Sequence, residues 1–184
     1  MDLHPLTPER YPDLAALFGT TAVTNTCYCT WFLMLDPERR EAWKAGQSRA
    51  IFERFATGST GPAGMLAYRD GTPVGWCAIG PRPEYPRLVK SKAWQGGDPD
   101  AWVVTCFYTH RSARHTGLTR TLLAAAVDLA AAHGATAVEA APRAIGVPTA
   151  AGDGYVGFEQ AFADCGFKEI GRPVPKRILM RRAL

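Results

Sequence analysis

The spacing of hydrophobic residues switches between helical and strand periodicity along the chain, which predicts a domain that mixes helices and strands. Apolar positions recur at helical spacing in four segments: 7–18, 36–58, 116–133 and 158–163. Short apolar runs predict six strands, at 65–68, 74–79, 102–109, 137–140, 167–170 and 177–180. The strand–helix–strand order within 102–140 requires a crossover connection, so its two strands should be parallel.

Turn and capping residues support these boundaries. Thr7-Pro8 suits a helix start, because Thr can cap and Pro fits the first helical position. Asp70-Gly71 between two apolar runs predicts a hairpin. The remaining stretches are polar or rich in Pro and Gly, and we expect them to be irregular: 20–30, 81–99 and 142–154. The longest, 81–99, is interpreted either as a mobile substrate loop or as an insertion at the sheet edge.

Composition bounds the class of protein. The 184 residues suit one domain, 1–184, and 47% hydrophobic with 21% charged residues is ordinary for a globular chain. A net charge of +4 suits an anionic ligand but is too small to indicate a nucleic-acid partner. The basic residues near the C-terminus are Lys168, Arg172, Lys176, Arg177, Arg181 and Arg182, against one acid, Glu169. This basic tail is either a solvated strand face or a set of contacts to a polyphosphate.

The sequence predicts a cytosolic protein. No basic segment followed by an apolar stretch opens the chain, and no apolar run could span a bilayer, so we expect neither a signal peptide nor a membrane partner. Five cysteines are an odd number, which argues against a complete disulfide framework. Cys27 and Cys29 lack a second ligand pair at zinc-site spacing, so no metal is expected and both are interpreted as small apolar residues near a substrate cleft.

Aromatic residues gather in two of the segments expected to be irregular. They are Tyr28, Trp31, Phe32, Tyr85 and Trp94. Core packing explains most aromatic residues, but loops that contain several can also form the wall of a small-molecule pocket. Both interpretations stay open at the level of sequence.

The segment 101–123 carries the most specific chemical signal. An apolar β-branched run ends in a short basic loop, Arg114-His115-Thr116-Gly117, and an apolar helix follows at once. The first N–H groups of a helix lack internal partners and lie at the positive end of the helix dipole. Gly117 would let a ligand approach the backbone, because glycine has no side chain. This order of elements is typical of a phosphate-binding turn.

The loop and the order of elements resemble the GNAT superfamily of acyl-CoA-dependent N-acetyltransferases. The family signature, Arg/Gln-x-x-Gly-x-Gly/Ala, here reads Arg114-His115-Thr116-Gly117-Leu118-Thr119, with Thr119 in place of the last small residue. The resemblance implies an α/β (in some schemes α+β) fold: a mixed, mostly antiparallel sheet of about six or seven strands, with a splayed parallel strand pair and about four flanking helices. It also implies that Phe107, Tyr108 and Thr109 pair with the pantetheine of acetyl-CoA, and that residues 114–119 hold the pyrophosphate.

The resemblance implies an N-acetyltransferase that moves the acetyl group of acetyl-CoA directly to a primary amine of a small molecule in a ternary complex. A backbone N–H near Phe107 or Tyr108 would stabilise the oxyanion. Glu139, on a short strand between alanines, is the expected base, against the interpretation of a solvated glutamate. The family often has a tyrosine acid near position 162, but Phe162 carries no proton, which leaves Tyr108 or Tyr155, unless both only pack.

Three other functions remain as alternatives. Phe162 and Thr119 favour an acyl-CoA-binding module without turnover, and a protein or peptide N-acetyltransferase is less favoured because nothing marks a long charged groove. Nucleic-acid binding by the basic tail would show steep salt dependence. The acceptor and the oligomeric state are left open, a homodimer included; resistance to an amine-bearing antibiotic is one version of the small-molecule hypothesis.

Overall fold

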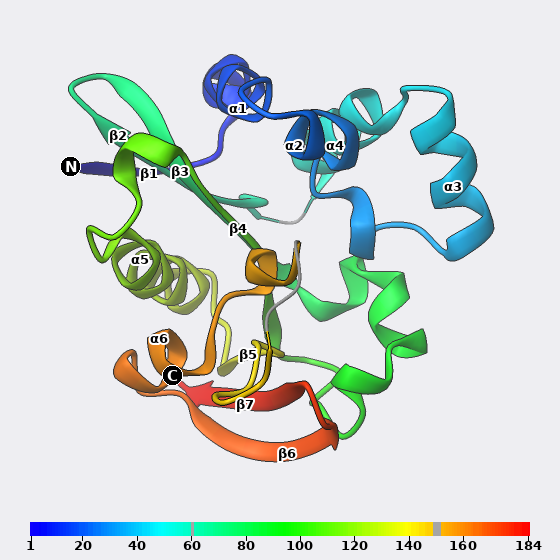
Figure 1. Cartoon of the computed structure of the whole chain (residues 1–184), viewed down its shortest axis with the longest axis vertical. Helices are drawn as coiled ribbons and strands as arrows, with labels where there is room; N and C mark the ends of the chain where they lie inside the picture. The colour runs from blue at the N-terminus through cyan, green and yellow to red at the C-terminus, as the bar shows by residue number, and fades with distance from the viewer. Residues whose placement is uncertain (60, 149–151) are drawn as a thin grey trace.

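The computed structural model describes residues 1–59, 61–148 and 152–184, and it is built on a seven-stranded sheet in the order β1-β2-β3-β4-β5-β7-β6 (Figure 1). The strands are β1 (Asp2–Pro5), β2 (Gly64–Arg69), β3 (Thr72–Pro81), β4 (Trp102–Thr109), β5 (Ala137–Ala140), β6 (Lys168–Val174) and β7 (Arg177–Ala183). The sequence did not predict β1, because Asp2-Leu3-His4-Pro5 is not an apolar run; this edge strand pairs with β2.

Every pair of neighbouring strands is antiparallel except β4 and β5, which are parallel. The parallel pairing runs only from Trp102 opposite Val138 to Val104 opposite Ala140. Residues 105–109 of β4 therefore extend past β5, and among the described residues no strand pairs with them on that side. The mixed sheet and the splayed parallel pair that we predicted are confirmed.

The described residues contain six α-helices rather than four. They are α1 (Tyr11–Phe18), α2 (Ala22–Cys27), α3 (Asp36–Lys44), α4 (Ser48–Gly58), α5 (Leu118–Ala132) and α6 (Glu159–Asp164). Helix α2 lies in the segment expected to be irregular, where Thr21 caps it by accepting from the Thr24 N–H at 3.2 Å. The single helix predicted for 36–58 is two helices, separated at Gly46, whose φ of +67° does not continue a right-handed helix.

Helices lie on opposite faces of the central strands (Figure 1). Alternate side chains of these strands pack against the two sets of helices. Met65 and Ala67 lie in the cluster that contains the apolar face of α5. Leu66 and Trp76 lie in the cluster that contains α1 and α4 residues. No helix in the described part of the chain is long and apolar enough to cross a membrane.

The segment 81–99 folds against the sheet as three short 3₁₀ turns, where the sequence predicted no element. Tyr85, Leu88 and Trp94 are buried there and belong to one hydrophobic cluster with Val103 of β4 and Leu179 of β7. These contacts favour the interpretation of an edge insertion over that of a substrate loop.

Candidate active site

A β-bulge in β4 changes which side chains face each side of the sheet. Ala78 of β3 lies opposite Cys106, whereas the next residue, Ile79, lies opposite Val104, so Thr105 is the extra residue. Because of this insertion, Val104 and Phe107 both pack in the α5-side core, while Thr105 and Cys106 line a cavity together. The bulge thus directs two consecutive side chains into one site, at the point where β5 stops pairing.

Three adjoining cavities follow this free part of β4. The loop cavity, of about 380 Å³, lies at the turn between β4 and α5. The strand cavity, of about 330 Å³, follows the end of β4 and shares Thr109, Arg114, Thr119 and Phe158 with the loop cavity. The aromatic cavity, of about 430 Å³, shares Tyr108, Gly152 and Tyr155 with the strand cavity. The shared walls make one path from the loop to the aromatic cavity.

The turn before α5 has the backbone of an anion site. His115 and Gly117 both have positive φ, +61° and +80°. Within the described part of the chain, no protein group accepts from the N–H groups of Gly117, Leu118 or Thr119. A Cβ added at Gly117 would meet nothing within 4 Å, so the space above it is open. Alternation of left-handed and other residues at a helix N-terminus turns several N–H groups toward one point, which suits a phosphate.

Side chains around the turn add charge and shape. The Arg114 guanidinium lines the loop and strand cavities, and its Nε lies 3.4 Å from the Thr109 carbonyl oxygen. Thr119 lines both cavities too, while His115, Gly117 and Leu118 line the loop cavity. Thr116 lines neither, since its hydroxyl donates to the Ala113 carbonyl at 2.8 Å and fixes the turn. The structure therefore brings Arg114 and Thr119 to the predicted Phe107, Tyr108 and Thr109 at the end of β4.

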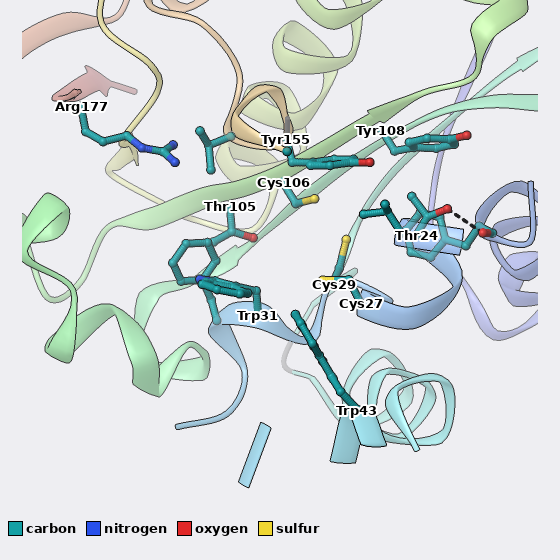
Figure 2. A pocket seen from close by; sticks show the side chains of 15 residues that line it. Thr24, Cys27, Cys29, Trp31, Trp43, Thr105, Cys106, Tyr108, Tyr155 and Arg177 are labelled. Atoms are coloured by element: carbon teal, nitrogen blue, oxygen red, sulfur yellow. Dashed lines mark hydrogen bonds between the residues drawn. The ribbon is translucent and has the colours of Figure 1, made fainter. Parts of the chain in front are cut away.

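Aromatic and sulfur-containing side chains form the third cavity. Figure 2 shows Thr105, Cys106, Tyr108 and Tyr155 on one side of it, with Cys27, Cys29, Trp31 and Trp43 on the other. Of the five aromatic residues noted in the sequence, Trp31 and Phe32 line this cavity, whereas Tyr28, Tyr85 and Trp94 are buried in the core. Phe18 and Trp43 also line it; their helical spacing resembles ordinary core packing, so the sequence carried no signal for them.

The Cys27–Cys29 segment enters the cavity through a strained turn. Tyr28 and Cys29 have φ of +47° and +55°, a conformation that costs non-glycine residues about 1 kcal/mol or more each. The buried Tyr28 ring anchors the turn, and the Trp76 indole N–H donates to the Cys29 sulfur at 3.3 Å. Burial raises the pKa of the Cys27 thiol to about 12, and the Cys106 thiol together with burial raises the pKa of Cys29 well above its usual value. Both thiols are therefore neutral at pH 7.

The two candidate tyrosines differ in what holds their hydroxyl groups. Thr20 donates its only hydroxyl proton to the Leu17 carbonyl at 2.7 Å, so in the 2.7 Å contact between Thr20 and Tyr108 the tyrosine is the donor. Tyr155 lies on a 3₁₀ turn, at the junction of the strand and aromatic cavities. Burial raises the pKa of Tyr155, so its hydroxyl keeps its proton at neutral pH.

Glu139 lies apart from these residues and lines none of the three cavities. Its side chain is fully buried, which excludes a solvated glutamate. The carboxylate pairs with the Arg82 guanidinium at 2.8 Å and accepts from the Asp98 N–H at 3.0 Å. Burial raises the pKa of Glu139, while the Asp98 N–H and the Arg82 and Arg181 guanidinium groups act in the opposite direction.

The basic tail does not form a single surface over the loop cavity. Arg172 pairs with Glu169 and Arg181 with Asp98, and Arg177 lines the aromatic cavity. None of these three side chains lines the loop cavity.

The position predicted for a family tyrosine, Phe162, is fully buried against Phe107. In the described residues, no group of three or more His, Cys, Asp or Glu side chains could hold a metal ion.

Solved structures share this fold. A ribosomal-protein-alanine N-acetyltransferase from Brucella melitensis is 21% identical, with a TM-score of 0.53 over 100% of both chains. A PaiA N-acetyltransferase from Thermoplasma acidophilum, in complex with coenzyme A, is 10% identical, with a TM-score of 0.55 over 100% of this chain and 98% of that one. A further acetyltransferase structure is 15% identical, with a TM-score of 0.62 over 100% of this chain and 99% of that one.

Sequence comparisons add the family. A comparison with curated proteins finds no match. The model of the acetyltransferase (GNAT) family matches residues 28–151, which is more than half of the chain and includes the bulged strand, the loop and α5. The chain therefore belongs to the acetyltransferase (GNAT) family and is an acyltransferase enzyme.

Proposed function

We propose that this enzyme transfers the acetyl group of acetyl-CoA to a primary amine of a small molecule, directly and within a ternary complex. The observation that carries the proposal is that three adjoining cavities follow one path, from the turn before α5, along the free end of β4, to the aromatic cavity. A cofactor with a diphosphate at one end and a thioester at the other matches such a path. Tyr155 lies where the path enters the aromatic cavity, which is where a thioester and an amine would meet.

The residues present fit coenzyme A. The open N–H groups of residues 117–119 would bind the diphosphate, and the Arg114 guanidinium would add a charge-assisted contact. Phe107, Tyr108 and Thr109 line the strand cavity, where β4 has no β5 partner for its backbone groups, so those groups are available to pantetheine amides. The Thr119 hydroxyl, where the family signature has Gly or Ala, could donate to a phosphate oxygen.

The neutral thiols favour direct transfer. A covalent acyl-cysteine route needs a thiolate, and burial raises the pKa values of Cys27 and Cys29 far above neutral pH. Within the described lining of the aromatic cavity there is no carboxylate to act as a base. An apolar site lowers the pKa of an amine by desolvation, so the acceptor would react as the neutral amine that such a site selects.

Tyr155 is the general acid in this proposal and would protonate the leaving thiolate. Tyr108 donates to Thr20, which leaves its oxygen free to accept a hydrogen bond from the amine. A backbone N–H of β4 near Phe107 or Tyr108 would stabilise the oxyanion. Glu139 has no part in the chemistry, since its carboxylate is engaged with Arg82 outside the cavities.

Release of free thiol from acetyl-CoA, measured across a panel of amines, tests the proposal. We expect release that depends on the amine; tight CoA binding without any release would instead support a binding module.

Arg114→Gln should weaken CoA binding by about 10-fold, the loss of one charge-assisted contact, in isothermal titration calorimetry. Arg111→Gln is the matched control, because Arg111 is exposed three residues earlier and lines none of the three cavities. Equal CoA affinity in both variants would remove the loop from the site.

A further inference from the structure

The aromatic cavity has a wall whose polar groups are already used inside the protein. The Trp43 indole N–H donates to the Thr30 hydroxyl at 3.0 Å, and the Thr30 hydroxyl donates to the Cys27 carbonyl at 2.6 Å. The Thr24 hydroxyl donates to the Phe18 carbonyl at 2.6 Å. Because these polar groups already bond to one another or to the backbone, the wall formed by residues 18–43 presents mostly aromatic rings and sulfur to the cavity.

The two tryptophans of this wall resemble a cation-binding cage, but they already hold a cation. The Arg39 guanidinium carbon lies 4.2 Å from the Trp31 ring centroid and 4.5 Å from that of Trp43. Arg87 lies 4.7 Å from Trp31 as well. The quadrupole of each ring is therefore engaged by a guanidinium of the protein itself.

Asp36, Arg39 and Arg87 form one charged group beside the Trp31 ring, here called the clamp, and this group carries a net positive charge. Asp36 accepts from both Arg39, at 2.8 Å, and Arg87, at 2.5 Å, so one carboxylate faces two guanidinium groups. Among the described residues that line the aromatic cavity, none is a carboxylate. A second ammonium on a bound amine would share the cavity with the Arg177 side chain and would have no described lining carboxylate to pair with, and burying an unpaired charge is costly.

We propose that the aromatic cavity takes an amine whose remaining part is one uncharged aromatic or branched apolar group, and that it rejects amines with a second cation. This inference names the acceptor class of the proposed function and rests on it. A volume of about 430 Å³ fits a compact molecule of this kind. The same arrangement argues against polycationic acceptors, including polyamine-like antibiotics.

Two amines with one skeleton test the inference: 2-phenylethylamine and its para-aminomethyl derivative, which carries a second ammonium. With the full chain and saturating acetyl-CoA, we expect kcat/KM from thiol release to be at least about tenfold higher for 2-phenylethylamine. Equal values, or a preference for the dication, would overturn the inference while leaving the proposed function intact.

A substitution of Arg39 in the clamp tests whether positive charge sets the selectivity between the two amines. Arg39→Met keeps an apolar side chain between the tryptophans and removes one positive charge, so it should reduce the selectivity by at least about threefold. Arg40→Met is the matched control, because Arg40 is the exposed neighbour on the same helix and should leave the selectivity unchanged. Unchanged selectivity in Arg39→Met would mean that the guanidinium does not set the preference.

A binding measurement tests the amine preference of the aromatic cavity separately from the proposed acetyltransferase activity. Quenching of tryptophan fluorescence, with CoA present, should give a Kd at least about tenfold lower for 2-phenylethylamine than for the dication. Selective binding without thiol release from either amine would refute the acetyltransferase proposal and retain the assignment of the cavity. Binding without selectivity would refute the inference, whether or not turnover occurs.

Discussion

Tyr108 and Tyr155 carry the same hydroxyl group beside the same cavity, and the proposed mechanism gives them different roles because their surroundings differ. Tyr108 is buried and donates its proton to Thr20, whose own proton is committed to the Leu17 carbonyl. Tyr155 is only partly buried, and its raised pKa keeps it protonated in front of the strand cavity. At the scale of single residues, the direction of one hydrogen bond is the reason why we propose Tyr155, and not Tyr108, as the proton donor.

Tyr155→Phe should lower kcat by about 100-fold and leave the KM for acetyl-CoA nearly unchanged, because the ring remains while the proton donor is lost. Steady-state kinetics with a saturating amine measures this. Tyr85→Phe is the control, since Tyr85 is buried in the edge insertion and lines none of the three cavities. A kcat equal to wild type would mean that water protonates the thiolate.

At the scale of elements, the acceptor side of the cavity depends on a short segment that is not stable by itself. The turn at Tyr28 and Cys29 is strained, and α2 and α3 have six and nine residues, too few for a stable isolated helix. Tertiary contacts hold the segment in place. The ring centroids of Tyr28 and Phe18 lie 5.1 Å apart, and the Arg39 guanidinium lies against two indole rings. The clamp formed by Asp36, Arg39 and Arg87 links this segment to the edge insertion.

The clamp should give a measurable pH dependence. Hydrogen bonds from Arg87 and Arg39 lower the pKa of the Asp36 carboxyl from 3.8 to about 2. Because the folded-state pKa lies below the unfolded value, the unfolded state binds more protons between these two values, and the stabilisation is complete above pH 4 and lost as the pH falls toward 2.

Thermal unfolding of wild type and Asp36→Asn checks this expectation. The difference in Tm between the two proteins should be constant from pH 7 to about pH 5 and should shrink as the pH falls from about 4 to 2. Since Asp36 is exposed, the effect is modest and should decrease with added salt. A Tm difference that does not depend on pH would show that Asp36 contributes nothing as an ion pair.

At the scale of the whole molecule, one buried ion pair joins three distant parts of the chain. Glu139 on β5 pairs with Arg82 and accepts from Asp98, both in the edge insertion, while Arg181 on β7 pairs with Asp98. A side chain at Gly97 would collide with Arg82 and Glu139, so the insertion can approach the pair only because glycine is there. The network holds the insertion against the sheet.

Glu139→Gln should destabilise the fold by about 3 kcal/mol, because Arg82 would remain buried without its partner, and should leave kcat of the folded enzyme unchanged at 25 °C. Urea unfolding and steady-state kinetics measure the two effects. The double variant with Arg82→Met should recover part of the stability, since it removes the unpaired charge. A loss of kcat at unchanged stability would instead support the role of general base that the sequence suggested.

Local sequence signals predicted the elements whose causes are local. The apolar run 102–109, the turn with Gly117 and the apolar face of α5 each carry their own periodicity or capping residue, and all are observed close to their predicted bounds. The break between α3 and α4 and the helix α2 were missed because threonines and a single Gly46 give weak signals, which packing overrides. The family signature further predicted a set of cofactor-binding residues, several of which line one cavity at the end of β4.

The sequence by itself determined the order of the strands from β2 to β7, the mixed sheet and the turn before α5 that we propose binds phosphate, because alternation, helical spacing and turn residues act over a few neighbours. The tertiary structure alone decided which residues form the aromatic cavity and what surrounds Glu139. Trp43 meets Thr30, and Glu139 meets Arg82, through contacts between residues far apart in the chain. Burial and pairing of this kind depend on the packing of whole elements, which no local pattern records.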